Sequence, residues 1–182
     1  YTNIDDPSAY FQATTYTGNN TGGASLNVTN SGNSDLQPDW VWIKSRSGAA
    51  NHNNSDSSRG ATKHLAQNIA YQEETVSGVS AYNSDGFTVG SNGDANTAGA
   101  TYVAWQWKAN GGTTTAFSES GNNPGGTYQA NTTAGFSIVT YTGTGAAGTV
   151  THGLGVAPKL IIIKNRDVAD PWAVYYGDAT DY

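Results

Sequence analysis

Pro38-Asp-Trp-Val-Trp-Ile-Lys-Ser-Arg46 is the most informative stretch of this chain, and it returns 120 residues later as Pro158-Lys-Leu-Ile-Ile-Ile-Lys-Asn-Arg166. In both copies apolar side chains fall on both faces of a predicted strand, which is typical of a strand buried at the centre of a sheet. An upstream motif is also repeated, as Phe11-Gln-Ala-Thr-Thr-Tyr-Thr-Gly18 and Phe136-Ser-Ile-Val-Thr-Tyr-Thr-Gly143. Self-similarity over so long a period indicates an array of like modules, not one active site built once.

The repeat divides the chain into four predicted segments. Residues 1–10 are polar and interrupted by proline, and we expect an N-terminal docking arm centred on Ile4, Asp5, Asp6 and Pro7. Residues 11–109 form the first module, residues 110–134 a linker rich in Gly, Thr and Asn, and residues 135–182 a partial second module. Because the second copy ends early, we expect the chain to be a fragment of a longer polypeptide.

Composition points to an all-β protein. Charged residues make up 12% of the chain and aromatic residues 11%, while Gly, Asn, Ser and Thr are abundant. Short strand patterns alternate with turn signals such as Asp85-Gly86 and Asn92-Gly93, and helical spacing occurs only over 59–72. The sequence therefore predicts an antiparallel β-sandwich of the jelly-roll or lectin-like kind, with at most one short helix, followed by the start of a second like module.

Charge and hydropathy exclude several partners. The net charge of −6 and the eight scattered Lys and Arg residues argue against a nucleic-acid surface. No apolar run is long enough for a membrane span, and the first ten residues lack the features of a signal peptide. Without cysteine, neither a disulfide nor a thiolate metal site can form.

Two Trp-x-Trp pairs offer a possible binding surface. Trp40 and Trp42, like Trp105 and Trp107, would project from one face of a strand, and such aromatic platforms stack against sugars. Trp40 and Trp42 align with Leu160 and Ile162 in the second copy, which favours a core role for that pair. Trp105 and Trp107 alternate with Ala104 and Gln106, so we expect a half-exposed strand whose Trp face points inward, with glycan contact as the alternative.

No catalytic, cofactor or metal residue is predicted. Glu73 and Glu74 are neighbours that would point apart, most aspartates lie beside turn residues, and a lyase or deacetylase remains open. His52, His64 and His152 lack metal spacing and are interpreted as surface or turn residues. Asn92-Gly-Asp-Ala-Asn96 begins like a calcium loop but lacks the later ligands, so a turn is favoured.

An ordered set of motifs resembles the tandem modules of uncharacterised structural proteins of tailed bacteriophages, often marine and often described as tail-fibre-like. The motifs, besides those already quoted, are Ser58-Arg-Gly-Ala-Thr-Lys63, Ser84-Asp-Gly-Phe-Thr88, Tyr102-Val-Ala-Trp-Gln-Trp-Lys-Ala109 and His152-Gly-Leu-Gly-Val-Ala-Pro-Lys159. The resemblance covers nearly the whole chain. It implies a virion component with no enzymatic residues to carry over.

The leading functional expectation is a non-enzymatic virion protein, most simply a tail fibre or spike that contributes to host attachment. The alternatives are a capsid decoration or head-fibre protein, and a carbohydrate-binding module. Expected partners are other virion proteins and a host surface glycan, with a homotrimer expected by analogy with phage fibres. The protein would be made in the host cytoplasm and released by lysis.

Overall fold

The first copy of the repeated strand lies inside a four-stranded antiparallel sheet. The structure, a computed structural model, describes residues 4–177. In it, β1 (Phe11–Thr17), β9 (Thr101–Trp107), β3 (Trp40–Ser45) and β4 (Asn53–Asp56) are neighbours in that order. The strands predicted from the repeated motifs and from Thr101 to Lys108 are thus confirmed, and β9 lies between β1 and β3.

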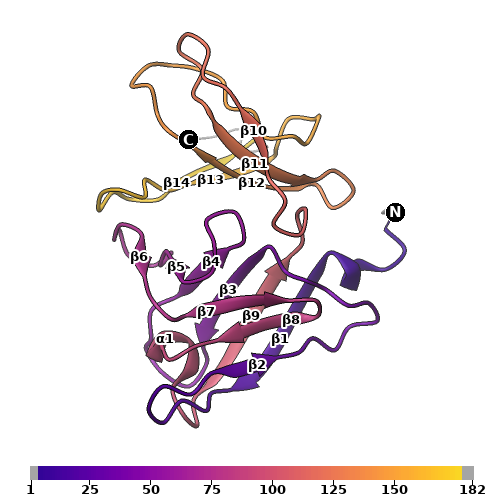
Figure 1. Cartoon of the computed structure of the whole chain (residues 1–182), viewed down its shortest axis with the longest axis vertical. Helices are drawn as coiled ribbons and strands as arrows, with labels where there is room; N and C mark the ends of the chain where they lie inside the picture. Colours follow the sequence, from indigo (N-terminus) through magenta and orange to yellow (C-terminus); the bar gives the residue numbers. More distant parts are fainter. Residues whose placement is uncertain (1–3, 178–182) are drawn as a thin grey trace.

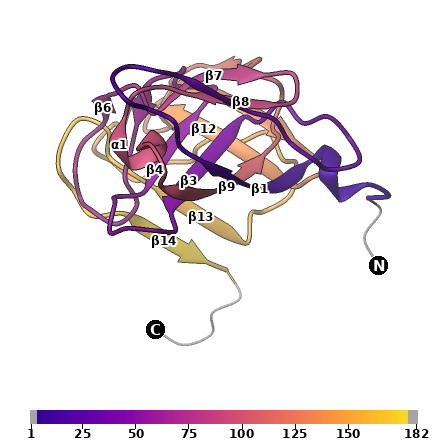
Figure 2. The same ribbon diagram turned by 90° about the horizontal axis from the view of Figure 1, so that it is seen from below.

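A second sheet covers one face of the first and closes a sandwich. It consists of β2 (Leu26–Val28), β8 (Gly86–Val89) and β7 (Val79–Asn83). Figure 2 shows β7 and β8 on one side of the strands β1, β9 and β3. Val41, Ile43, Tyr102 and Phe87 form the centre of the core between the sheets. The predicted all-β, antiparallel, sandwich-like fold is confirmed.

The hairpin β7–β8 shows why a glycine is needed at its turn. Gly86 pairs with Asn83 and has φ of 107°, a conformation that favours glycine. A Cβ atom there would also collide with the carbonyl of Val28 on β2. The Asp85-Gly86 turn predicted from the sequence is therefore fixed both by backbone geometry and by the close approach of β2.

The prediction of at most one short helix is confirmed for residues 4–177, but the α-helix does not lie over 59–72, where the helical spacing occurs. That segment contains β5 (Lys63–His64), which pairs with β6 (Glu74–Thr75). A one-turn helix α1 (Gly93–Asn96) forms instead at the Asn-Gly signal, where the side chain of Asn92 accepts a hydrogen bond from the Asp94 amide at 2.9 Å. A capping side chain, Asn92, thus marks the helix, whereas the spacing of apolar residues every four positions over 59–72 does not.

Strand β4 is buried although its sequence, Asn-Asn-Ser-Asp, is entirely polar. All four residues from Asn53 to Asp56 are buried. The side chain of Asn54 accepts a hydrogen bond from Trp40 Nε1, and Asp56 lies 2.5 Å from Arg59 Nε. Neighbouring residues thus supply a hydrogen bond to Asn54 and an opposite charge to Asp56. The buried side chains of Asn53 and Ser55 have no hydrogen-bond partner among the described residues.

Residues 110–177 form a second unit beyond the first, which comprises residues 4–109 (Figure 1). The second unit contains the sheet β10-β11-β12 and the hairpin β13-β14. Its strands are β10 (Thr115–Phe117), β11 (Gly126–Asn131), β12 (Phe136–Tyr141), β13 (Leu160–Ile163) and β14 (Ala173–Tyr176).

The segment 110–134, predicted to be a linker rich in Gly, Thr and Asn, contains regular strands. Strands β10 and β11 lie within it, and Gln129 on β11 is 1% exposed. Alternating Thr, Tyr, Gln and Ala residues in β11 pair along the whole of β12, so the glycine-rich flanks supply turns on either side of real strands. Among residues 4–177, no helix has the length and apolar character needed to cross a membrane.

Candidate functional site: an aromatic layer between the two units

The outer face of the first sheet, opposite the sandwich core, carries a cluster of aromatic side chains. Strand register places Trp107 opposite both Phe11 and Trp40, and Trp105 opposite Trp42. Ring centroids are 4.6 Å apart for Trp40 and Trp107, 5.5 Å for Trp42 and Trp105, and 4.9 Å for Phe11 and Trp107. We call these five residues, Phe11, Trp40, Trp42, Trp105 and Trp107, the aromatic layer.

This arrangement overturns the predicted orientation of Trp105 and Trp107. Ala104 and Gln106 are fully buried in the first unit, and the tryptophans point to the opposite face, where they are half-buried. Gln106 is tolerated inside because its amide nitrogen donates to Asn30 Oδ1 at 2.6 Å and to Thr14 Oγ1 at 3.1 Å. Trp40 and Trp42 likewise lie outside the sandwich core, on the face opposite Val41 and Ile43.

The second unit covers part of the aromatic layer through a single ring. Phe136, the first residue of β12, stacks on Trp40 with centroids 5.7 Å apart and planes 13° from parallel. Its ring also lies 6.2 Å from that of Trp107. Offset stacking of this kind adds to the energy of apolar burial, so the aromatic layer helps to hold the two units together.

His52 borders the aromatic layer at Trp42. Its Nδ1 accepts a hydrogen bond from Trp42 Nε1 at 2.8 Å, and the two rings are 5.6 Å apart. Because Nδ1 is the acceptor, the ring proton of the neutral form sits on Nε2. Burial, and then the charge of Lys44, lower the pKa of His52 below its ordinary value. The arrangement requires a neutral imidazole.

Polar groups complete the interface between the units. Gln129 donates its amide to Ser57 Oγ at 2.8 Å and to Ser58 Oγ at 2.6 Å, and it accepts from the Gly112 amide at 3.1 Å. The buried carboxylate of Asp39 accepts from the amides of Ala109, Gly111 and Gly112 at 2.7 to 2.9 Å. Asp39 therefore fixes the chain where it leaves β9, and the acid is held by a turn rather than presented to solvent.

An ion-pair chain links the units at a second place. Glu73 accepts from Arg59 Nη1 at 2.9 Å in the first unit and from Arg166 Nη2 at 2.9 Å in the second. Burial raises the pKa of Glu73, but hydrogen bonds from Arg166 and Arg59 outweigh it and hold that pKa below its ordinary value. Nearby, Trp172 Nε1 donates to the carbonyl of Ala66 at 3.0 Å. The Glu73 carboxylate therefore serves to connect the two units through Arg59 and Arg166.

The predicted docking residues are partly folded onto the first unit. Asp6 caps the 3-10 helix Pro7–Ala9 through the Ser8 amide at 2.9 Å, and its other oxygen accepts from Ser34 Oγ at 2.6 Å. Asp5 and Pro7 are exposed, and Ile4 is half-buried. Residues 1–3 of the predicted arm, like residues 178–182 of the predicted partial module, lie outside the described residues.

The remaining candidate ligands are engaged in the fold. The Asn96 side chain is buried and donates to the carbonyl of Gly90 at 2.8 Å, so the calcium-like segment is a capped helical turn. His64, expected at the surface, is buried on β5, where its Nε2 lies 3.1 Å from the carbonyl of His52. Within residues 4–177 no group of three or more His, Asp or Glu side chains could hold a metal ion.

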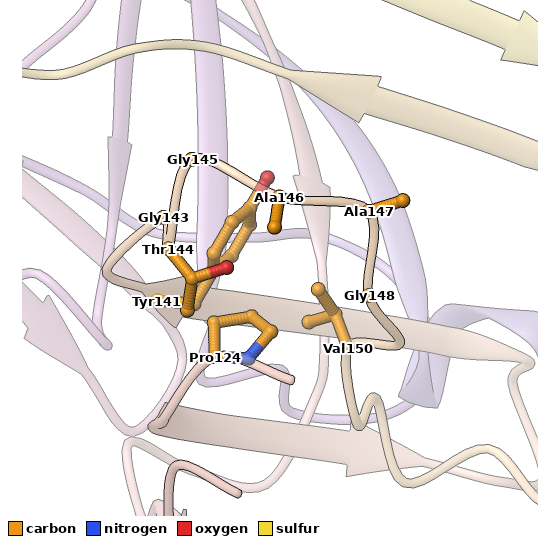
Figure 3. A pocket seen from close by; sticks show the side chains of 9 residues that line it. All are labelled: Pro124, Tyr141, Gly143, Thr144, Gly145, Ala146, Ala147, Gly148 and Val150. Atoms are coloured by element: carbon orange, nitrogen blue, oxygen red, sulfur yellow. The ribbon is translucent and has the colours of Figure 1, made fainter. Parts of the chain in front are cut away.

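A hollow in the second unit lies beside Tyr141. Its volume is about 410 Å³, and its walls come from Pro124, Tyr141, Val150 and the loop 143–148. Figure 3 shows the Tyr141 ring among the residues of that loop, with Pro124 and Val150 nearby. The side chains of the walls carry no charge, and the hollow is open to solvent.

Comparison with known proteins identifies the family. Residues 6–182 match the family described as a domain of unknown function, DUF7483. The chain belongs to this family. No curated protein and no solved structure matches the chain. The DUF7483 match covers residues of both units, including the aromatic layer and Phe136.

Sequence reasoning missed Phe136, Glu73 and Gln129 as interface residues of this DUF7483 chain. It also missed the contact of His52 with the aromatic layer. One contact of the interface had no signal in the sequence. Arg166 is the repeat counterpart of Arg46, yet it makes an ion pair with Glu73 in the first unit, which lies 93 positions away. A polar contact over that separation has no local signature, whereas the aromatic stacking follows from strand register once the sheet order is known.

Proposed function

We propose that this protein is a non-enzymatic structural component of a bacteriophage virion, most simply a tail fibre or spike that contributes to host attachment. The observation that carries the proposal is the packed interface between two related units, made by Phe136 on the aromatic layer and by Glu73 between two arginines. Appendages transmit load along a row of modules, and a row needs fixed joints of this sort.

The contacts of three acidic side chains support the non-enzymatic part of this proposal. Hydrolysis of a glycosidic bond needs two free carboxyl groups facing a cleft. Asp39 accepts three backbone amides, Asp56 binds Arg59, and Glu73 lies between two arginines. Each of these carboxylates already has the partners that its charge requires.

Immunogold electron microscopy of intact particles tests the proposal, with antibody raised against this chain. We expect label on the tail or on fibre tips. Label spread evenly over the head would support the alternative of a capsid decoration or head-fibre protein. Absence of label from purified particles, with label on free protein as the positive control, would overturn the virion assignment.

The docking arm is tested by a truncation that respects the structure. Removal of residues 1–5 leaves Asp6 to cap its 3-10 helix and to hold Ser34, whereas removal of residues 1–10 would also disrupt the fold around Gln12 and Ser34. If the arm docks the protein, the shorter truncation abolishes incorporation into particles while the circular dichroism spectrum stays unchanged. Normal incorporation would contradict a docking role for Ile4 and Asp5.

A carbohydrate-binding module is the second candidate, favoured by the half-buried aromatic layer. Among the described residues, Trp105 has one ring contact, with Trp42, while Phe136 covers Trp40 and Trp107. Stacking of a pyranose on Trp105 would quench tryptophan fluorescence on addition of host glycan. Trp105→Ala should abolish that quenching and Trp172→Phe should retain it, since Trp172 lies outside the aromatic layer.

A further inference from the structure

The chain contains two Asn-Gly pairs, Asn92-Gly93 and Asn110-Gly111. In such a pair the glycine amide nitrogen can attack the asparagine side chain, because glycine has no side chain to hinder the approach and its backbone turns freely. The side chain then loses ammonia, and asparagine counts among the thermolabile residues of proteins. Whether a given pair reacts depends on how firmly the fold holds the glycine amide and the asparagine side chain.

The first pair is held entirely within the first unit. Asn92 caps α1 with an extended backbone, ψ being 128°, and its side-chain oxygen accepts from the Asp94 amide at 2.9 Å. The carbonyl of Asn92 accepts from the Asn96 amide at 2.8 Å, and that of Gly93 accepts from the Tyr102 hydroxyl at 3.0 Å. The reactivity of this pair therefore reports on the first sandwich and does not depend on the second unit.

The second pair lies in the turn that connects the two units. The turn comprises Asn110, Gly111, Gly112 and Thr113, and the Thr113 amide donates to the Asn110 carbonyl at 3.1 Å. Both glycines have positive φ, 61° and 79°. The Asn110 side chain is exposed, and its Nδ2 donates to the Thr113 carbonyl at 3.0 Å. Water thus reaches this asparagine.

Both units hold this turn in place. Asp39 of the first unit accepts from the amides of Gly111 at 2.9 Å and Gly112 at 2.7 Å. Gln129 of the second unit accepts from the Asn110 amide at 3.2 Å. The Gly111 N–H bond therefore points at the Asp39 carboxylate. In the cyclic imide that would form, the Asn110 Cγ takes the place of that hydrogen, so the ring cannot close while the hydrogen bond to Asp39 is made.

We propose that Asn110 is a site of spontaneous deamidation, protected while the two units are in contact and reactive when they separate. Once the Gly111 amide is released from Asp39, its nitrogen forms a bond to Cγ of Asn110. The bond from Cγ to Nδ2 breaks, and the amide proton leaves with Nδ2 as ammonia. Water then opens the ring at either of its two carbonyls and gives aspartate or isoaspartate at position 110. The reaction needs water and no other reactant.

Either product prevents the turn from regaining its contacts. In the aspartate product a carboxylate replaces the amide that donated to the Thr113 carbonyl, so two acceptors face each other and a negative charge joins the turn that binds Asp39. In the isoaspartate product the main chain runs through Cβ, and the extra carbon displaces Gly111 and Gly112 from Asp39. Deamidation would thus make separation of the units irreversible. None of these contacts depends on the virion assignment.

Incubation of the full chain near neutral pH, followed by tryptic digestion and fragmentation mass spectrometry, measures both pairs at once. Cleavage after Lys63, Lys108 and Lys159 places Asn92 and Asn110 in different peptides. In urea that unfolds the chain, we expect similar rates at the two sites. In the folded protein Asn110 should react at least about tenfold more slowly than in urea, because the reaction proceeds from the small population of locally opened molecules. Equal rates at Asn110 with and without urea would overturn the proposal.

A matched pair of variants tests whether the contact between the units controls the reaction. Phe136→Ala removes the ring that stacks on the aromatic layer, so the rate at Asn110 should rise towards its rate in urea while Asn92 keeps its wild-type rate. Phe117→Ala, whose ring contacts Tyr128 within the second unit, should leave both rates unchanged. An unchanged rate at Asn110 in Phe136→Ala, or an equal rise at Asn92, would contradict control by the interface.

A second pair of variants tests the consequence of the reaction. Asn110→Asp represents the aspartate product, and its tryptophan emission should shift to longer wavelength as the aromatic layer becomes more hydrated, with an unchanged circular dichroism spectrum. Asn92→Asp is the control, since aspartate caps a helix as well as asparagine does, and its emission should match that of wild type. Wild-type emission in Asn110→Asp would contradict the irreversible step.

Discussion

Phe136 stacks nearly parallel on Trp40, 5.7 Å away, and this pair joins two units whose sequences repeat each other. Phe136 is also the repeat counterpart of Phe11, which packs on Trp107 in its own unit. The same motif position therefore contributes an aromatic ring to one outer face from two directions. The surface that the sequence suggested as a sugar platform is, in part, the contact between the two units, which we call the joint.

Replacing Phe136 with Ala should loosen the joint without unfolding the first sandwich. We expect a loss of about 1–2 kcal/mol in the free energy of unfolding, because a half-buried ring is removed from an aromatic stack. Tryptophan emission should shift to longer wavelength as Trp40 and Trp107 become more hydrated. Phe117→Ala is the control, since that ring contacts Tyr128 within the second unit and should leave the emission wavelength unchanged.

Neutralising Glu73 should uncouple the second contact between the units. Glu73→Gln leaves the Arg59 side chain, 4% exposed, with Asp56 as its one acidic partner. We expect a loss of about 2 kcal/mol in denaturant unfolding, whereas Arg166→Gln, at the more exposed partner, should cost less than about 1 kcal/mol. Glu119→Gln, at an exposed position of the second unit, is the control. Equal losses in Glu73→Gln and Glu119→Gln would show that the ion-pair chain contributes nothing.

Acid should weaken the same contact. The pKa of Glu73 is lower in the folded protein than its ordinary 4.5, so the unfolded chain binds the proton more readily. The stabilisation is complete above about pH 4.5 and is lost as pH falls through the lowered pKa. The difference in unfolding free energy between wild type and Glu73→Gln should therefore shrink as the pH falls below about 4.5. A difference independent of pH would contradict this assignment.

His52 should respond to pH in the range above that of Glu73. Its folded pKa lies below the ordinary 6.5, so protonation favours the unfolded chain and breaks the hydrogen bond from Trp42. Stability from this contact is full above pH 6.5 and falls as pH drops through the lowered pKa. Trp42 emission should change over the same interval in wild type but not in His52→Gln, and an identical profile in both proteins would refute the role of His52.

Asp39 should be the most sensitive acid in the first unit. Asp39→Asn replaces an acceptor with an amide group that faces three backbone N–H groups near Ala109, Gly111 and Gly112. We expect a loss of about 3 kcal/mol, measured by chemical unfolding, since hydrogen bonds to a buried charge are lost. Asp35→Asn, at an exposed position, should change stability by less than about 0.5 kcal/mol.

The strands of the first unit could be predicted because their sequences alternate or repeat and end at turn residues. Strands β1, β3 and β9 and the hairpin at Gly86 follow from such local signals. The orientation of Trp105 and Trp107 could not, because Gln106 is buried through Asn30 and Thr14, which are far away in sequence. Polar residues that are satisfied at long range invert the usual rule that the larger apolar side chains face the core.

The interface between the two units could not be predicted for the same reason, because its hydrogen bonds join residues that are far apart in the sequence. Gln129 was assigned to a glycine-rich linker, yet its amide binds Ser57 and Ser58 and its carbonyl oxygen receives amides of residues 110 and 112. The composition of residues 110–134 is an average over the whole segment. A short run of alternating side chains within it, residues 126–131, is sufficient to form strand β11. Trp105 and Trp107 lie on the outer aromatic face and not in the core, where they were expected, and the contact of this face with Phe136 depends on how the two units pack.

The joint between the units is made from unlike surfaces, the outer face of one sheet and the start of a strand in the next unit. An interface between two different surfaces is called heterologous. When such a contact is repeated, it builds a row of units that grows in one direction, unless the rotation between neighbouring units closes the row into a ring. Any row of such units would therefore have two chemically different ends. That polarity would allow one end to be anchored and the other to be presented outward.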